Sequence, residues 1–183
     1  MKLIEEYSGG SIKVEEYAPG SLVGNEREAT EAIQLGSIDM SNVSDMGIDG
    51  VIGGLGWAWL PYMITDYKTA DEYYINGWIG EELAKKMGQS NIIKVAPYEN
   101  DFRVLGVKRN PINELSDFKG VKIRVPEIDQ LLRFYQLTGG LSVTIAASET
   151  LTALEQGTIE GVDNSMLNLM GLGLLPSIDY IIV

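Results

Sequence analysis

Residues 121–145, VKIRVPEIDQLLRFYQLTGGLSVTI, carry the clearest succession of elements in the chain. Residues 121–125 read as a strand, and Pro126 then takes the first position of a helix, where proline is well tolerated. The apolar stripe of that helix consists of Ile128, Leu131, Leu132 and Tyr135. After a pair of glycines, a short strand is expected over residues 141–145. The segment thus predicts a strand, a helix and a strand in succession.

The same order is expected near the start of the chain. Residues 11–17 (SIKVEEY) read as a strand, and residues 37–43 read as another. Between them, Asn25 begins a helix, with Glu28 three positions on in a capping-box pattern. Strand, helix and strand in this order suit a parallel sheet, so the predicted fold class is α/β.

The other elements follow from similar signals. Helices are expected over 69–76, 78–87, 148–157 and 165–172, and strands over 92–97, 102–107, 158–162 and 180–183. Thr69 with Glu72, and Ser148, are expected to cap two of these helices. The glycine-rich stretch 45–56 (DMGIDGVIGGLG) is expected to be an irregular connection. It has neither the lysine and hydroxyl residue of a phosphate loop nor the terminal glutamate of a calcium loop.

Composition narrows the function. The chain has 183 residues, enough for one ordinary domain or two small lobes, and its 45% hydrophobic and 22% charged residues are typical of a soluble globular protein. Acidic residues outnumber basic ones by 26 to 14, and the net charge of -12 repels nucleic acids and anionic membranes. An anionic ligand would therefore depend on a few local cations.

Cysteine and histidine are both absent. The chain therefore has no thiolate nucleophile and lacks the side chain most used for acid–base catalysis and zinc ligation near neutral pH. We accordingly predict no enzyme activity, no catalytic residue, no metal and no cofactor. No apolar stretch is long enough to cross a bilayer, and the acidic start MKLIEEY lacks the apolar run of an export signal.

Three segments resemble a known family. They are GNEREATEAIQLGSIDM (24–40), PINELSDFKGVKIRVPE (111–127) and ASETLTALEQGTIEGVDNS (147–165), and with intermediate stretches the likeness covers nearly the whole chain. They resemble the TRAP (tripartite ATP-independent periplasmic) transporter solute receptors. The resemblance implies a two-lobed, type II periplasmic binding protein outside the cytoplasm. Such a receptor captures a small carboxylate-bearing organic anion and delivers it, without ATP, to a membrane permease driven by an ion gradient.

The resemblance also implies an organisation. Residues 1–102 would be a first lobe that lacks its first strand and helix, and residues 103–183 a second lobe cut at the return crossover. The chain would then begin near the end of the first helix of a receptor and stop as the return strand begins at Tyr180. It would thus be incomplete at both termini, without an export signal.

Two arginines are the main candidates for the binding site. The family motif K-[IL]-R-V-P occurs as KIRVP, and the resemblance implies that its arginine, Arg124, pairs with the ligand carboxylate. A guanidinium offers two parallel donors that match two carboxylate oxygens. Without that motif, an ordinary surface ion pair would be expected. Arg103 stands where the family often has a second arginine that reaches the ligand, but it could equally pair with one of the chain's many carboxylates.

Three further positions match the family's ligand-lining residues. Asn164 stands where a Q-E-N-P motif supplies an amide, although it could instead cap the helix expected from Ser165. Ser44 matches a lining position in some members and could otherwise be a solvated serine at a strand end. Ala147 replaces an aromatic residue that covers the ligand in many relatives, and Ser165 replaces the usual proline. These departures leave the lid, the pocket volume and the solute open.

Two other functions compete with transport. One is a ligand-sensing domain of the same fold, which fusion to a membrane or kinase segment would distinguish. The other is a small α/β enzyme that uses carboxylates, with Glu149, Glu155, Glu160 and Asp163 as its acid–base candidates. Acidic residues in so acidic a chain more often form a solvated face.

Overall fold

We describe the protein from a computed structural model, which describes residues 2–18, 20–54 and 56–183. Residues up to 102 form helices and connecting segments. The elements are α1 (Lys2–Tyr7), α2 (Glu26–Leu35), α3 (Asp45–Ile52), the 3-10 turn η1 (Gly56–Trp59), α4 (Tyr67–Thr69), the π-helical turn η2 (Ala70–Ile75) and α5 (Trp78–Gln89). Among the described residues, no helix is both long and apolar enough to span a bilayer.

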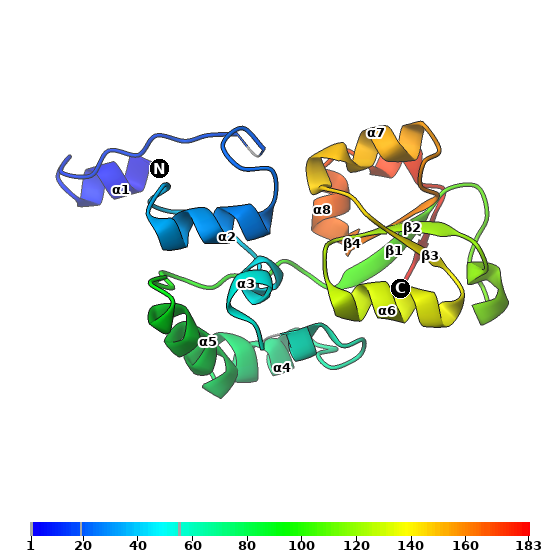
Figure 1. Cartoon of the computed structure of the whole chain (residues 1–183), viewed down its shortest axis with the longest axis horizontal. Coiled ribbons are helices and arrows are strands. Elements are labelled where there is room, and N and C mark those ends of the chain that lie inside the picture. Colours follow the sequence, from blue (N-terminus) through cyan, green and yellow to red (C-terminus); the bar gives the residue numbers. More distant parts are fainter. Residues whose placement is uncertain (1, 19, 55) are drawn as a thin grey trace.

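From residue 103 onward, strands and helices alternate. The strands are β1 (Arg103–Val107), β2 (Lys122–Val125), β3 (Leu141–Thr144), β4 (Gly161–Ser165) and β5 (Tyr180–Ile182). The helices are α6 (Asp129–Thr138), α7 (Thr150–Glu155) and α8 (Met166–Gly171), with the 3-10 turns η3 (Leu115–Phe118), η4 (Ala147–Glu149) and η5 (Leu175–Ser177). The two halves lie side by side, with the sheet confined to the second (Figure 1).

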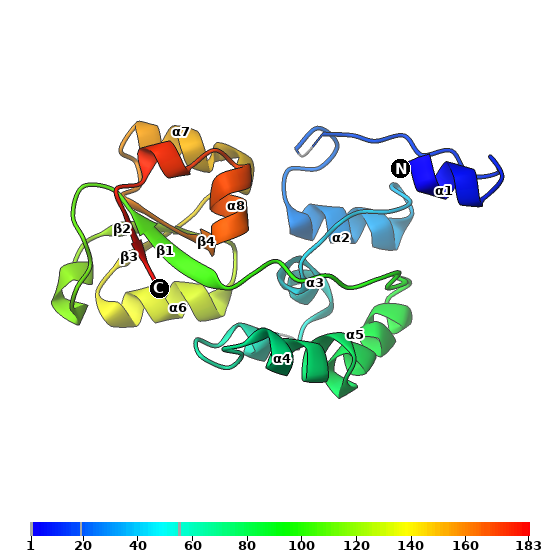
Figure 2. The same cartoon turned by 180° about the vertical axis from the view of Figure 1, so that it is seen from behind.

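The sheet has the strand order β3-β2-β4-β1-β5. β2 pairs in parallel with β3 and β4, and β1 pairs antiparallel with β4 and β5. Helix α6 covers one face and helices α7 and α8 cover the other, as the two opposite views agree (Figures 1 and 2). The predicted α/β class is therefore confirmed.

Each face of the sheet buries its own apolar cluster. The cluster under α6 comprises Leu105, Val107, Ile123, Val125, Ile128, Leu131 and Tyr135. The cluster under α7 and α8 comprises Ala153, Leu154, Ile159, Val162, Leu169 and Leu174. Each fully buried side chain of this kind stabilises the fold by roughly 1.5–3 kcal/mol. A smaller cluster, Ile48, Leu83, Met87 and Ile92, joins α3 to α5 in the first half.

Most predicted elements of the second half are confirmed, with local corrections. Helix α6 begins at Asp129, after Ile128 rather than at Pro126. The predicted strand 158–162 lies three residues later, as β4, because Thr158 and Ile159 still donate to the carbonyl of Ala153 and close the end of α7. Ser148 does not cap a helix but lies inside η4.

The expected parallel sheet of the first half is absent from its described residues. Segments 11–17, 37–43 and 92–97 have no ladder partner, so their strand propensity is not realised. A strand needs a neighbour to pair its backbone groups, and side-chain preference alone does not supply one. Ile93 and Val95 accordingly remain 85% and 80% exposed.

The glycine-rich stretch 45–56 was expected to be an irregular connection, but most of it forms helix α3. Ser44 caps the helix by accepting from the backbone N–H of Gly47, and Gly53, with a φ of 76°, ends it. A Cβ on Gly47 would lie 2.6 Å from Cβ of Glu26, so this glycine lets α3 approach the start of α2. Close packing thus offsets the poor helix propensity of glycine.

Capping follows the prediction at one helix and departs from it at another. Asn25 caps α2 by accepting from the N–H of Glu28, whose carboxylate in turn accepts from Gly24, one residue before the cap. Near residue 69, however, Asp66 is the cap, and Thr69 donates to it from both its backbone and its hydroxyl. Thr69 therefore lies inside the helical turn that it was expected to begin.

Candidate anion-binding site

Strand register brings the main candidates to one edge of the sheet. Arg124 stands near the carboxyl end of β2, where it pairs with Val162 of β4. Two residues further along β4 is Asn164, next to Ser165. Because β1 runs antiparallel to β4, its first residue, Arg103, lies opposite Ser165. The carboxyl ends of parallel strands form a common edge in α/β folds, where ligands are most often bound.

Alternation along the strands assigns these residues to two faces. Arg124 shares a face with Val162 and therefore with Asn164, under α7 and α8. Arg103, opposite Ser165, shares the other face with Asp163, under α6. The sheet edge therefore carries one arginine from each face.

Arg124 is a buried cation. It is 5% exposed, and its Nε donates to the carbonyl oxygen of Ile145 at 2.8 Å. In the part of the chain that the structure describes, no carboxylate forms a salt bridge with it. Burial and the neighbouring charge of Arg103 lower the pKa of Arg124 to about 10, while Asp163 and Glu26 act in the opposite sense. The surface ion pair considered from the sequence is thus not what forms.

Arg103 is held by Asp163. Its Nε donates to Oδ1 of Asp163, and its Nη2 donates to the backbone carbonyl of the same residue at 2.8 Å. The second carboxylate oxygen accepts from the hydroxyl of Tyr135 on α6 at 2.6 Å. Burial and the Asp163 carboxylate raise the pKa of Tyr135, so it stays a protonated donor. Pairing with a carboxylate was one of the two roles expected for Arg103, and its contact with a ligand remains a prediction.

Trp59 completes this cluster from the first half of the chain. The guanidinium carbon of Arg103 lies 5.5 Å from its ring centroid, a cation–π distance. Its indole Nε1 is buried and has no hydrogen-bond partner among the described residues. A tryptophan of the first half therefore covers an arginine of the second.

Asn164 is buried, and the oxygen of its side-chain amide is already hydrogen-bonded. Its Oδ1 accepts from the backbone N–H of Ser165 at 2.9 Å and from Nδ2 of Asn168 at 3.1 Å. Ser165, not Asn164, is the cap of α8, since its hydroxyl accepts from the N–H of Asn168. Its Nδ2 donates no hydrogen bond to the residues that the structure describes, so both of its N–H groups are available to a ligand.

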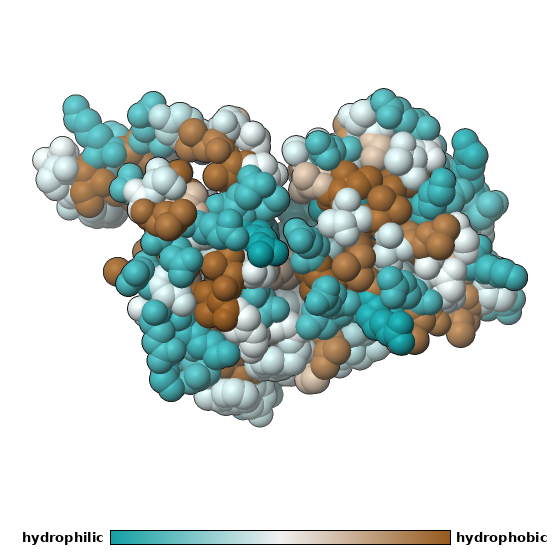
Figure 3. All heavy atoms as spheres, viewed as in Figure 1, coloured by the Kyte–Doolittle hydropathy of each residue, from teal (hydrophilic) through white to brown (hydrophobic). Residues whose placement is uncertain are grey.

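The first half supplies the facing wall. Glu26 opens α2, and its carboxylate accepts from the hydroxyl of Ser44. The next residue, Arg27, reaches across to Glu127, with 3.8 Å between Nη1 and Oε1. Ser44 is thus a helix cap on this wall rather than a serine at a strand end. Figure 3 shows a hollow between the two halves that hydrophilic residues flank.

Ala147 lies near the backbone group that holds Arg124. It opens η4, two residues after Ile145, whose carbonyl holds Arg124. Its side chain is small and exposed, and Gly20 of the first half lies near Ser148, the residue that follows it.

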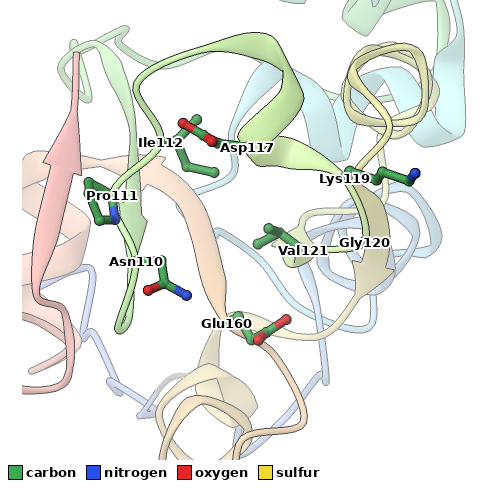
Figure 4. A pocket seen from close by; sticks show the side chains of 8 residues that line it. All are labelled: Asn110, Pro111, Ile112, Asp117, Lys119, Gly120, Val121 and Glu160. Atoms are coloured by element: carbon green, nitrogen blue, oxygen red, sulfur yellow. The ribbon is translucent and has the colours of Figure 1, made fainter.

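A second hollow lies at the other end of β2. Figure 4 shows it lined by Asn110, Pro111, Ile112, Asp117, Lys119, Gly120, Val121 and Glu160. The carboxylate of Asp117 accepts from the backbone of Asn113 and Glu114, and that of Glu160 accepts from Lys122. These carboxylates are already partnered and would oppose an anion, so this hollow is not the candidate site.

The carboxylates considered for catalysis do not form a site. Glu149 and Glu155 are exposed on η4 and α7, Glu160 lies at the opposite end of β4, and Asp163 is tied to Arg103 and Tyr135. In residues 2–18, 20–54 and 56–183, no group of three or more acidic side chains is arranged to hold a metal ion.

Glu26, Trp59 and Tyr135 were not considered as site residues from the sequence. Asp163 was considered only as an acid–base candidate of an enzyme, not as a partner of Arg103. The pairing of Asp163 with Arg103 could not be predicted, because the expected strand ended at residue 162 and the strand order was not known. The positions of Trp59 and Glu26 relative to the sheet depend on how the two halves of the chain pack, which no local sequence pattern indicates.

Comparison with known proteins gives a consistent result. The family described as bacterial extracellular solute-binding protein, family 7, matches residues 1–183. The uncharacterized protein YiiZ of Salmonella typhimurium is 30% identical over 165 residues, which cover 88% of this chain and 49% of that protein. The C4-dicarboxylate-binding protein DctB of Bacillus subtilis is 26% identical, with 99% and 51% covered. The chain thus spans about half the length of these relatives.

A solved structure agrees with the fold. It is a TRAP periplasmic solute-binding protein from Polaromonas bound to D-erythronate, with 29% identity and a TM-score of 0.89. The match covers 98% of this chain and 59% of that one. The backbone described above is therefore that of solved solute-binding proteins over most of its length.

Proposed function

Because the chain belongs to family 7 of the bacterial extracellular solute-binding proteins, the TRAP solute receptors, we propose that it is the solute-capturing part of such a receptor. Its ligand is a small organic anion that presents a carboxylate to Arg124. DctB is named for C4-dicarboxylates, and the Polaromonas protein holds D-erythronate, so a carboxylate is the group that these ligands share.

The single observation that carries this proposal is the state of Arg124. The side chain is buried, and its Nε donates to the backbone carbonyl of Ile145. Its two terminal nitrogens make no salt bridge in the described part of the chain. A buried cation without a bound counter-charge is costly. A carboxylate that accepts from both terminal nitrogens would remove that cost, which gives the site its affinity.

Asn164 and Arg103 complete the proposed contact set. The two free donors of Asn164 lie on the same face of the sheet as Arg124 and suit a second ligand oxygen. Arg103 stands at the same edge of the sheet on the other face, where Asp163 fixes its position and compensates its charge. The charge of Arg124 would therefore be the main local attraction against the repulsion that an overall charge of -12 exerts on an anion.

We propose that residues 1–102 and 103–183 act as two lobes that close over the ligand. The interactions of Arg27 with Glu127 and of Trp59 with Arg103 cross between them and support closure in this arrangement. Closure would present the loaded protein to a TRAP permease in the membrane, outside the cytoplasm. Ser44 and Ala147 would then border the ligand from opposite sides.

We further propose that binding is not followed by chemistry. Support comes from the family, which is one of solute-binding receptors, and from the dispersal of the acidic side chains described above. In the sequence, neither histidine nor cysteine is available to act as base or nucleophile.

A thermal-shift screen tests the proposal. Small carboxylates, including C4-dicarboxylates and four- to six-carbon hydroxy acids, should raise the Tm of the wild-type chain in proportion to the logarithm of their concentration. The same compounds should leave the Tm of Arg124→Ala unchanged. A compound set without any Arg124-dependent shift would contradict the proposed function.

A further inference from the structure

A short segment between α5 and β1 leads the chain from the first half into the second (Figures 1 and 2). Within it, Asp101 has a left-handed backbone with a φ of 67°, and β1 begins two residues later at Arg103. We propose that Asp101 is the pivot between the two halves and that Tyr67 is its latch, a positioning residue that fixes how the halves are oriented. The inference goes beyond the proposed function and rests on one part of it, the movement of residues 1–102 against residues 103–183.

The left-handed conformation of Asp101 is held by its own carboxylate. Its Oδ1 accepts from the backbone N–H of Phe102 at 2.8 Å and from the hydroxyl of Tyr67 at 2.6 Å. A residue other than glycine is strained at positive φ unless its surroundings stabilise it, although aspartate tolerates this region better than most. Without these bonds, φ of Asp101 would be free to return to negative values. That rotation would turn the whole chain from Phe102 onward relative to what precedes it.

Tyr67 supplies the bond that comes from outside the segment. It opens α4 in the first half, where Asp66 caps the helix, and α4 continues directly into η2. Its ring centroid lies 4.9 Å from that of Phe102, at an interplanar angle of 58°. Tyr67 therefore contacts both residues that precede β1, one through its hydroxyl and the other through its ring. The latch ties the start of β1 to the helices of the first half.

The segment has anchors on both sides of the pivot. Before it, the hydroxyl of Tyr98 donates to Oδ1 of Asn42 in the first half at 2.6 Å. After it, Arg103 pairs with Ser165 in the ladder between β1 and β4. The hydroxyl of Ser165 also reaches Oδ1 of Asn100, at a long 3.5 Å. The few residues between these anchors must absorb any change in the orientation of the halves, and hinges of this kind are typical of proteins that close over a ligand.

A latched pivot changes the cost of closure. Closing over a ligand removes freedom from the two halves, and this loss is smaller when the connection between them is already fixed. Neither Tyr67 nor Asp101 is one of the proposed ligand contacts. The latch would therefore act on affinity through the orientation of the halves.

Spin-label distances test the inference without any ligand. The chain has no cysteine, so Glu81→Cys on α5 and Arg133→Cys on α6, both exposed, place one label on each half. Pulsed electron paramagnetic resonance should give one narrow distance distribution for the chain that carries only these two changes. Adding Tyr67→Phe should widen that distribution about twofold or more, because Asp101 loses its latch. Tyr98→Phe removes a hydroxyl bond of the same 2.6 Å length before the pivot, and it should leave the distribution unchanged.

Two substitutions of Asp101 separate its backbone conformation from its bonds. Asp101→Asn keeps an oxygen acceptor and a tolerance for positive φ, so it should match the parent chain. Asp101→Gly permits the left-handed backbone but has no acceptor, so it should widen the distribution at least as much as Tyr67→Phe. Urea unfolding of each variant separates a change of orientation from a loss of fold.

The outcomes are decisive in both directions. An unchanged distribution in Tyr67→Phe and Asp101→Gly would overturn the inference, and so would equal widening in Tyr98→Phe. Widening in Asp101→Gly alone would overturn the role of Tyr67. The proposed function is tested separately by the Arg124-dependent thermal shift, so its failure would be recognised independently of these distances.

Discussion

Arg103 and Asp163 are joined twice, once through the carboxylate and once through the backbone carbonyl, which accepts from Nη2 at 2.8 Å. The charge of Arg103 is therefore compensated within the protein. Arg124 has no such pair in the described residues, and its burial is the reason that its pKa falls to about 10. The two arginines thus differ in their surroundings: Arg103 is paired with a carboxylate, whereas Arg124 bonds a backbone carbonyl and is the arginine that we propose meets the ligand.

Tyr135→Phe should weaken the scaffold. The substitution removes the hydroxyl that donates to Oδ2 of Asp163 at 2.6 Å and leaves that buried oxygen without this donor. The expected loss in the free energy of unfolding is about 1–3 kcal/mol, measured by urea titration. Tyr67→Phe is the matched control, because its hydroxyl donates to Asp101 over the same distance at an exposed site. Equal losses in the two variants would show that Asp163 does not depend on Tyr135.

Arg124→Met should stabilise the ligand-free chain. The folded state lowers the pKa of Arg124 from 12.5 to about 10. Below pH 10 the side chain is charged, and burying that charge lowers the free energy of unfolding. This loss is recovered only as the pH rises through about 10. A shift of this size corresponds to roughly 3 kcal/mol, offset in part by the lost bond to Ile145. We expect a net gain of about 1 kcal/mol, or a rise in Tm of about 2–4 °C.

Arg133→Met serves as the control for that measurement, because Arg133 is exposed on α6. Its Tm should change little, by the equivalent of about 0.5 kcal/mol at most. A lower Tm for Arg124→Met than for Arg133→Met would mean that Arg124 is satisfied within the fold and carries no unmet charge.

Asp45→Asn should change how stability depends on pH. Burial raises the pKa of Asp45 above its usual 3.8, against the bond that Tyr74 donates to it. Because the folded pKa is the higher one, the carboxylate destabilises the fold as the pH rises above 3.8. The asparagine variant should therefore be more stable than wild type at pH 7 and equal to it near pH 3. If urea unfolding showed the same stability difference between the variant and wild type from pH 3 to pH 7, the raised pKa of Asp45 would not be its cause. Asp71→Asn, at an exposed site, is the matched control for the substitution.

The sequence predicted what is local or periodic. The α/β class, the strand that carries Arg124, and the cap of α2 at Asn25 all follow from patterns that span a few residues. The stripe of Ile128, Leu131 and Tyr135 is buried as expected, because a helix packed on a sheet must hide its apolar side.

Features that depend on distant partners were missed. Residues 11–17 have the composition of a strand but no neighbour to pair with, and α3 forms despite its glycines because Gly47 permits contact with Glu26. Similarly, the position of Trp59 over Arg103 depends on how two halves of the chain pack, which no local pattern encodes. The motif could suggest Arg124, but its burial and its single backbone bond came from the structure.

The most direct test of the central claim is calorimetry of one carboxylate ligand, chosen as the strongest in the thermal-shift screen, against wild type, Arg124→Lys and Arg124→Ala. Loss of the charge-assisted fork should cost about 2–5 kcal/mol in the alanine variant. The lysine variant should also bind at least ten times more weakly than wild type, since a point charge cannot donate two parallel bonds. Wild-type affinity in both variants would contradict the account, because the ligand would then be held elsewhere.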